Sequence, residues 1–188
     1  MNNIYRLKIY LKGRPKIWRR FLVEDNITFN KLHEIIQDVM GWQNYHLYEF
    51  EFNRSRISIP DEDSGLEASD SRKLKIKNLK INQRFEYTYD FGDSWEHIIA
   101  VEKIMPKEDN VFYPRCIEGE LSCPPEDCGG IYRYSHLLSV KKNRKHPEYK
   151  ELIEEWLGKD FDPKIFDVNE VNKKLLKHMG HYFKKSNK

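Results

Sequence analysis

Two stretches of the sequence concentrate the side chains that could do chemistry. They are DFGDSWEH at residues 90–97 and YPRCIEGELSCPPEDCGG at residues 113–130. Together they supply five candidate catalytic residues: Asp90, Asp93, His97, Glu126 and Asp127. General acid–base catalysis and metal-assisted hydrolysis both use carboxylates and imidazoles. Because the strand between the two stretches is apolar enough to be core, we predict that the 113–130 loop folds against the 90–97 hairpin. This would bring His97 close to Glu126, Asp127 or a cysteine.

The first stretch has two interpretations that the residues leave open. In one, Asp93 orients the His97 ring or accepts its proton, as acid–histidine pairs do in catalysis and metal binding. In the other, Asp93 hydrogen-bonds the backbone amides of a tight turn, with Gly92 at positive φ, and His97 lies within a sheet face. The DFG tripeptide does not indicate a protein kinase, because the chain has no HRD catalytic loop and no glycine-rich phosphate loop.

The second stretch holds all three cysteines, Cys116, Cys123 and Cys128, in the pattern C-x6-C-x4-C. Zinc binds thiolates and imidazoles in a tetrahedral shell, so a zinc site here would need a fourth ligand from His97, His136 or water. Compact structural zinc sites usually show C-x2–4-C spacing, and only the second gap is close to it. Reduced cysteines in a core or loop, and redox chemistry, are the alternatives.

Basic residues gather at both ends of the chain, although the formal net charge is only +3. Residues 1–23 contain seven lysines and arginines and no acid, and residues 171–188 contain six lysines and no acid. Such ends could present cations to an anionic partner such as nucleic acid. The alternative is a set of basic strand edges and a solvated tail. The candidate binding residues are Arg6, Lys8, Arg19 and Arg20.

Length and composition fit a single domain, 1–188, with a sizeable core. The 13% aromatic content argues against disorder. No apolar run approaches the ~20 residues that a membrane helix needs, and the amino terminus has no signal-peptide block. Three cysteines is an odd number for a disulfide framework. We therefore expect a cytoplasmic protein with reduced thiols, no membrane association and a flexible tail at 180–188.

Residue periodicity predicts the elements that must position these side chains. Alternation of apolar and polar residues, or a centre apolar on both faces, indicates strands at 4–12, 17–24, 46–54, 84–91 and 95–105. Helical periodicity indicates helices at 29–40, 132–143, 146–158 and 167–180, with His33 at the surface or its boundary. The acidic segment 61–73 is predicted to be a surface loop. The predicted fold class is α+β, a largely antiparallel sheet covered by helices, with a helical C-terminal part and, by analogy, a β-grasp-like core.

Five segments, taken in order, carry a family resemblance. They are IWRRFLV, LHEIIQDVMGWQNYHLYEF, YTYDFGDSWEH, YPRCIEGELSCPPEDCGG and LGKDFDPKIFDVNEVN, within about residues 4–175. In this order they resemble the plasmid pRiA4b ORF-3-like family. The resemblance implies a single intracellular α+β domain of bacteria and archaea, often encoded on plasmids or beside mobile elements. It implies no particular reaction, cofactor or catalytic residue. The resolvase label of some relatives transfers poorly, because this chain shows no catalytic-serine domain and no helix-turn-helix.

Two classes of function follow from these observations. The favoured one is a non-enzymatic binding module for a protein or nucleic acid, acting through the basic ends. The alternative is a metal-assisted hydrolase built from Asp90, Asp93 and His97 with Glu126 and Asp127, with zinc as the candidate cofactor. The acidic middle of the chain weighs against a continuous phosphate-binding surface.

Overall fold

The computed structural model describes residues 3–60 and 67–186. Its centre is an eight-stranded sheet in the order β5–β4–β3–β6–β7–β1–β2–β8. The strands are β1 (Asn3–Leu11), β2 (Trp18–Glu24), β3 (Tyr48–Phe52), β4 (Ser55–Ser58), β5 (Ser69–Asp70), β6 (Arg84–Tyr89), β7 (Trp95–Pro106) and β8 (Arg115–Glu120). The helices are α1 (Phe29–Met40), α2 (Gly130–Lys142), the π-helix η2 (Lys150–Leu157) and α3 (Val168–Ser186). Only the short β4–β5 pair is parallel, so the predicted α+β class is confirmed.

Alternation along the central strands gives the sheet a buried face and an open face. The apolar side chains of β1 that the alternation groups together are all buried: Tyr5, Leu7, Ile9 and Leu11. Their polar neighbours project to the other side. β1 and β2 form the predicted antiparallel hairpin, and so do β6 and β7 about the turn at residues 90–94. The opening hairpin and helix on which the β-grasp analogy rested are present, and β1 then pairs antiparallel with β7.

Helix α1 forms where its periodicity predicts and packs on the buried face. Thr28 Oγ1 accepts a hydrogen bond from the Lys31 backbone amide at 3.1 Å, and Gly41, with φ of 101°, ends the helix. Its apolar stripe is buried in the core: Phe29, Leu32, Ile35, Ile36, Val39 and Met40. The predicted helix boundaries and the predicted packing are both confirmed.

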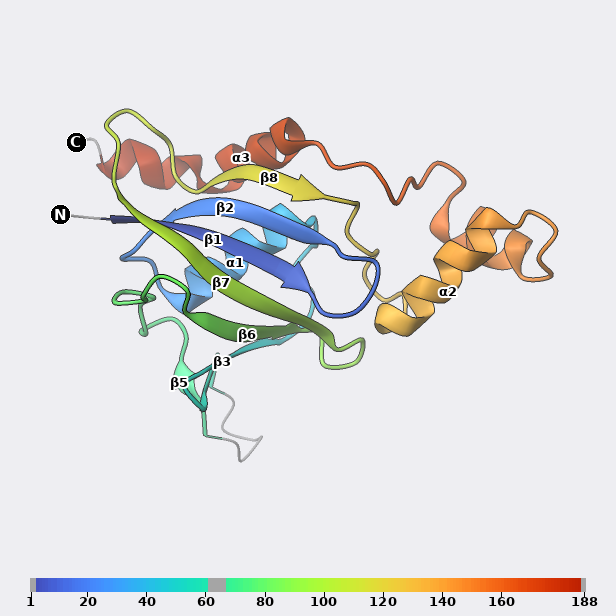
Figure 1. The fold of residues 1–188 in the computed structure, drawn as a ribbon, viewed down its shortest axis with the longest axis horizontal. Helices are drawn as coiled ribbons and strands as arrows, with labels where there is room; N and C mark the ends of the chain where they lie inside the picture. The colour runs from blue at the N-terminus through green and yellow to red at the C-terminus, as the bar shows by residue number, and fades with distance from the viewer. Residues whose placement is uncertain (1–2, 61–66, 187–188) are drawn as a thin grey trace.

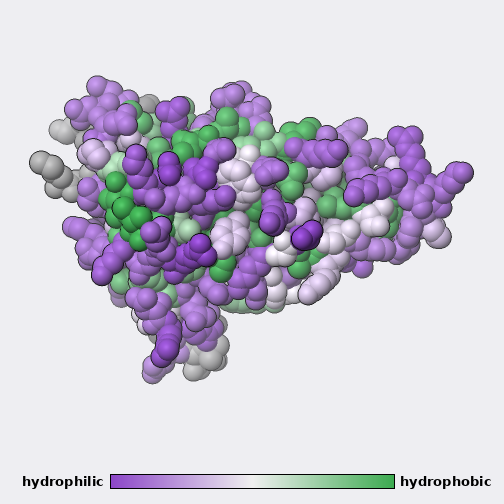
Figure 2. Space-filling model, in the orientation of Figure 1, coloured by the Kyte–Doolittle hydropathy of each residue, from purple (hydrophilic) through white to green (hydrophobic). Residues whose placement is uncertain are grey.

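The remaining helices lie at the edges of the sheet. Figure 1 shows α1 behind the sheet, α3 running beside β8, and α2 with η2 beyond one end of the strands. The face turned toward the viewer carries no helix, and Figure 2 shows that it is largely hydrophilic. Among the described residues, no helix is both long and apolar enough to cross a membrane.

Two predictions about the C-terminal helices are wrong: the start of the helix expected at 146–158 and the end of the helix expected at 167–180. The helix expected from Pro147 begins at Lys150 and has π-helical winding, and it ends at Gly158 as predicted. Its wider turn rotates Trp156 away from the buried face, so that this residue is 47% exposed. Helix α3 continues through Gly180, because glycine in a helix interior costs only about 1 kcal/mol. The flexible tail stays a prediction, since residues 187–188 lie outside the described residues.

Two strands and one buried histidine also differ from the sequence predictions. β8 lies inside the stretch expected to be a loop, and it pairs with β2. β5 lies inside the segment 61–73, of which residues 61–66 are outside the described residues, and Ser71 is fully buried there. His33 is buried rather than near the surface, because its ring stacks on Tyr48 with 3.5 Å between the ring centroids.

Candidate functional site

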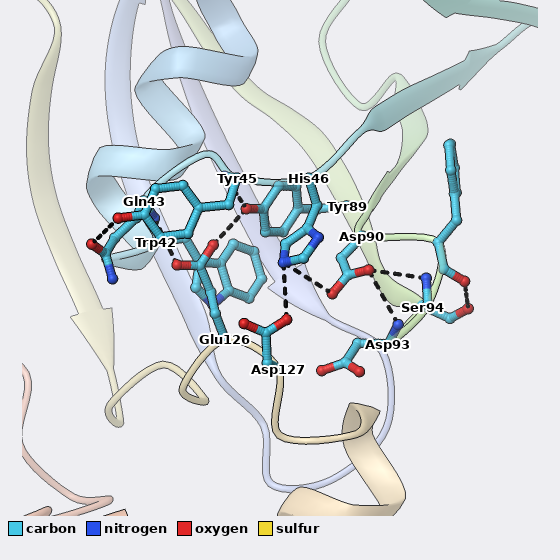
Figure 3. A network of polar contacts seen from close by, with 12 residues as sticks. Trp42, Gln43, Tyr45, His46, Tyr89, Asp90, Asp93, Ser94, Glu126 and Asp127 are labelled. Atoms are coloured by element: carbon cyan, nitrogen blue, oxygen red, sulfur yellow. Dashed lines mark hydrogen bonds and ion pairs between the residues drawn. The ribbon is translucent and has the colours of Figure 1, made fainter.

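Three loops from distant parts of the chain meet at one end of the sheet. They are residues 41–47 between α1 and β3, 90–94 between β6 and β7, and 121–129 between β8 and α2. Figure 3 shows polar side chains of all three loops pointing toward one another. The Gly129 amide donates to Asp93 Oδ2 at 3.0 Å. The prediction that the 113–130 stretch folds against the hairpin is therefore confirmed.

One histidine and two aspartates, called the His46 cluster here, form the centre of the site. His46 Nε2 lies 3.1 Å from Asp127 Oδ1 and 3.7 Å from Asp90 Oδ2. Within residues 3–60 and 67–186, this is the only group of three or more Cys, His, Asp or Glu with ligand atoms all within 4.8 Å of one another. Ligands bound to one ion at about 2.0–2.2 Å lie roughly 3–3.5 Å apart, so the observed spacing fits a shared cation.

The His46 nitrogen at the centre of the cluster is unusual because it is buried and makes no hydrogen bond. Its contact with Asp127 has the distance of an ion pair but not the direction of a hydrogen bond. A buried ring nitrogen without a partner costs free energy. The Asp127 side chain is 69% exposed, so the cluster opens to solvent on that side. The arrangement would be completed by an ion that takes the nitrogen lone pair.

Asp90 holds the hairpin turn with one oxygen and faces His46 with the other. Its Oδ1 accepts hydrogen bonds from the Gly92 amide at 2.9 Å and the Asp93 amide at 3.3 Å. The sequence interpretation gave this turn-holding role to Asp93 and positive φ to Gly92. Instead, Asp90 and Ser94 take the positive φ values, 55° and 52°. Aspartate tolerates that region because its side chain bonds locally to the backbone.

Both aspartates of the cluster have a left-handed backbone. The φ angles are 55° at Asp90 and 58° at Asp127. Aspartate adopts this region more readily than most residues, and eight other non-glycine residues of the described chain also have positive φ. At these two positions the left-handed turn accompanies the approach of two carboxylates to one imidazole.

A second set of contacts fixes the 121–129 loop. Glu126 accepts hydrogen bonds from Tyr89 Oη at 2.5 Å and from the Gln43 amide at 3.0 Å. Burial and the neighbouring Glu126 raise the pKa of Tyr89 well above its ordinary value of 10, so its hydroxyl stays a donor. The Trp42 indole donates to the Pro124 carbonyl at 3.0 Å. These bonds preorganise the loop before any ligand binds.

His97 does not belong to the cluster. It is fully buried, its ring lies 5.4 Å from that of Trp42, and its Nδ1 faces the Tyr87 carbonyl at 3.3 Å. Burial lowers its pKa to about 3. The structure thus agrees with the interpretation that places His97 within a sheet face. His46 supplies the imidazole that the shared site was predicted to contain.

The three cysteines do not gather with His97 into a metal shell within the described residues. Cys116 lies on β8, while Cys123 and Cys128 lie on the 121–129 loop, and all three are free. Burial raises the pKa of Cys116 to about 11 and that of Cys128 to about 12, and it raises the pKa of Cys123 further. The thiols match the alternative of reduced core and loop cysteines.

Three of the four basic binding candidates lie on the open face with partners of their own. Glu102 contacts Arg20 at 2.6 Å and Arg6 at 3.1 Å. The Lys8 ammonium lies 4.1 Å from the centre of the Trp18 ring. These contacts neutralise or shield the cations that the sequence offered for phosphate binding.

The fourth candidate, Arg19, projects to the opposite side and is only 3% exposed. Its guanidinium donates to the carbonyl oxygens of Val39, Trp18 and Glu120. It also lies 4.3 Å from the Phe166 ring. A side chain held in this way cannot act as the surface cation that the sequence predicted.

Sequence reasoning missed His46 and the tyrosines beside it, Tyr45 and Tyr89. The available signal was position. The segment 41–45 begins at the glycine that ends α1 and precedes the strand predicted at 46–54, so a surface loop carried by two rigid elements was expected there, with His46 at its end. Such loops hold functional side chains more often than their length suggests.

Fold and site together define an α+β protein with a carboxylate–histidine cluster built from three loops at one end of an antiparallel sheet. The family model described as "Plasmid pRiA4b ORF-3-like protein" matches residues 3–170. The chain therefore belongs to the plasmid pRiA4b ORF-3-like family, as the five sequence segments predicted.

Two relatives extend this comparison. "Uncharacterized protein y4hQ" from Sinorhizobium fredii (strain NBRC 101917 / NGR234) is 34% identical over 176 residues, which cover 91% of this chain and 90% of the relative. A crystal structure titled "Protein of Unknown Function MM3350 from Methanosarcina mazei Go1" is 39% identical, with a TM-score of 0.84. The match covers 91% of this chain and 98% of that chain. Neither name states an activity, so function has to be inferred from the site.

Proposed function

We propose that this protein binds a divalent cation through His46, Asp90 and Asp127, and that the ion serves a metal-assisted hydrolysis. The observation that carries the proposal is the convergence of their three ligand atoms within 4.8 Å of one another. The buried His46 nitrogen without a hydrogen-bond partner supports it.

The ligand set favours zinc or another first-row transition metal. One imidazole nitrogen and two carboxylate oxygens suit zinc, manganese or iron, whereas calcium takes six to eight oxygen ligands. Zinc thus remains the candidate cofactor, with ligands other than the cysteines.

Three protein ligands leave coordination positions open, which is the pattern of catalytic rather than structural zinc sites. A cation bound there would lower the pKa of a water molecule toward neutrality. Asp93 is our candidate general base. Its Oδ2 accepts from Gly129, and Figure 3 shows its carboxylate on the same side as those of Asp90 and Asp127. Tyr89 and Glu126 hold the wall of the site.

Binding of nucleic acid through the basic ends receives less support. Arg6 and Arg20 share Glu102, and Arg19 is buried. We place the protein in the cytoplasm, where its three free cysteines would stay reduced.

The first prediction tests the metal site. Titration of the full chain with Zn²⁺ or Mn²⁺ by calorimetry should show one ion per chain, because three ligand atoms already converge. His46→Ala and Asp127→Asn should weaken affinity at least about 100-fold, since each removes a direct ligand. The matched control is His136→Ala, which removes an exposed histidine that also contacts an acid, Glu148, at 3.0 Å.

Cys123→Ser should leave the stoichiometry unchanged. Unaltered affinity in His46→Ala, or loss of the ion in Cys123→Ser, would contradict the proposed ligands. Hydrolysis is tested with the metal-loaded chain on a phosphodiester, a carboxylic ester and a casein substrate. Asp93→Asn should lower the rate on whichever is cleaved while metal affinity stays within about threefold. If metal binds but none of the three substrates is cleaved, the hydrolase proposal is contradicted and metal binding alone is supported.

A further inference from the structure

A groove of about 660 Å³ adjoins the His46 cluster on the side of Asp127. Its walls come mainly from loop 41–45, loop 122–127 and residues 161–171, which run from a connection into the first turn of α3, with Arg19 of β2 and the end of α1 completing the lining. Glu126 and Asp127 line the groove and also belong to the site described above. The groove therefore provides room for a ligand larger than the ion itself.

The lining of the groove includes large apolar side chains that are partly exposed. Tyr45 is 70% exposed and Ile165 is 61% exposed, although both are large side chains that normally avoid water. Phe161, Phe166 and Pro124 line the wall between them. Aromatic and aliphatic side chains that stay exposed at the mouth of a groove indicate contact with a partner.

The charge of the groove is negative. Four acids line it: Glu126, Asp127, Asp167 and Glu170. Among the described ion pairs, only Glu170 has a lysine partner, Lys173. The one arginine in the lining is Arg19, whose guanidinium is already bound to three backbone carbonyls.

Lys174, on α3 close to the groove, is also engaged. Lys174 donates to the Trp42 carbonyl at 3.0 Å and lies 3.7 Å from Asp38. Among the residues that line the groove, phosphate groups would therefore meet four carboxylates and no unengaged cation, which disfavours nucleic acid and anionic lipid. A basic ligand with apolar side chains would complement both the walls and the charge.

One wall of the groove is restrained by prolines and a hydrogen bond. Two consecutive prolines, Pro124 and Pro125, form part of its wall, and the Trp42 indole bonds to the Pro124 carbonyl at 3.0 Å. A wall that is ordered before binding loses little entropy when a partner arrives. A flexible ligand could bind such a wall, because only the ligand would then lose conformational entropy.

We propose that this groove binds a basic segment of another polypeptide, with apolar side chains of the segment on Tyr45, Ile165 and the phenylalanines. The proposal goes beyond the metal site and does not depend on it, because the groove walls and charges exist without an ion. It identifies the partner class as protein, with lysine or arginine next to leucine or an aromatic residue.

The experiment measures fluorescence anisotropy of labelled dodecapeptides with the full chain in EDTA. The probe alternates lysine and leucine, its twin alternates glutamate and leucine, and a third arm is a single-stranded DNA dodecamer. The basic peptide should bind saturably and at least tenfold more tightly than the acidic twin or the DNA. Equal binding of the acidic twin, tighter binding of the DNA, or no saturable binding of the basic peptide overturns the proposal.

Variants locate the binding. Ile165→Lys should lower the affinity for the basic peptide at least tenfold, because it introduces a positive charge next to a positively charged ligand and removes an apolar contact. Ile81→Lys is the matched control, since Ile81 is an equally surface-placed isoleucine, 52% exposed, outside the groove lining. Equal effects of the two substitutions would overturn the placement. Repeating the peptide titration with Zn²⁺ distinguishes peptide binding in the groove from metal binding at the His46 cluster. If the chain does not bind the metal, the peptide affinity measured in EDTA is unaffected.

Discussion

The open face of the sheet and the His46 cluster both concentrate charged side chains, but they arrange them in opposite ways. At the centre of the open face, Glu102 lies between Arg6 and Arg20, so charges of opposite sign satisfy one another. In the His46 cluster two carboxylates face one imidazole, and Glu126 lies beside them with no lysine or arginine partner among the described residues.

Charge is evidence for binding mainly where it is left uncompensated. Paired charges on a flat sheet face contribute modestly to stability and leave little field for a partner. Like charges held close together cost folding free energy, and their cost is offset when a cation binds. The His46 cluster is therefore stronger evidence for binding than the open face, because its charges are not compensated.

The largest expected effect is that of pH on the free energy of unfolding, through two buried histidines of the core. Burial lowers the pKa of His33 to about 4 and that of His97 to about 3, from an ordinary 6.5. The unfolded chain therefore binds more protons below pH 6.5, and stability should fall as pH decreases from there. Each histidine contributes about 1.4 kcal/mol per pH unit, or about 4 kcal/mol for both between pH 7 and 5.

Urea unfolding at a series of pH values measures this loss. His97→Leu should remove roughly half of the pH dependence between pH 6.5 and 4, because one titrating group is gone. His46→Ala serves as the comparison within the cluster and should leave the slope from His33 and His97 in place. An unchanged slope in His97→Leu would show that this histidine is not held neutral in the core.

The second expected effect concerns the contact that brings the 121–129 loop to the hairpin. Gly130 has φ of 76°, and a Cβ there would lie 2.5 Å from the Asp93 carbonyl oxygen. Gly130→Ala should destabilise by about 3 kcal/mol or more, because backbone strain and a backbone clash add. Gly158→Ala is the control: φ is 86° but a Cβ meets no atom within 4 Å, so about 1 kcal/mol is expected.

Chemical denaturation measures both glycine variants, and metal titration follows on the folded proteins. Gly130→Ala should also lower metal affinity, since it displaces the loop that carries Asp127, whereas Gly158→Ala should not. Similar stability losses in the two variants would mean that the close approach of loop and hairpin is not as tight as described.

The smallest expected effect compares single acids from the two regions. Glu102→Gln should cost about 1–2 kcal/mol, because its carboxylate is 20% exposed and serves two arginines. Asp127→Asn in EDTA should change stability by less than about 0.5 kcal/mol or raise it, since a like charge is removed. Unfolding is measured at low and at high salt. The loss of stability in Glu102→Gln should be smaller at high salt, because salt screens the ion pairs. A loss of stability in Asp127→Asn equal to that in Glu102→Gln would contradict the conclusion that charges are compensated on the open face but not in the His46 cluster.

The candidate site was predictable in part. Asp90, Asp93, Glu126 and Asp127 were found because carboxylates beside turn residues stand out in a sequence. Their meeting was also predicted, since an apolar strand between two polar loops has to be covered. His46 was not found, because the two interpretations of the hairpin considered only the histidine nearest in sequence. His97, at an inward position of β7, is buried by the alternation of that strand.

By itself the sequence determined the elements whose periodicity is strong. The alternation of β1 and β7 and the capped stripe of α1 depend on neighbours along the chain, so local pattern and structure agree. Only the tertiary structure decided which charges would be paired. Arg20 and Glu102 are 82 positions apart, and His46 and Asp127 are 81 apart. Contacts at such separations depend on strand order and loop closure, which residue types and spacing do not encode locally.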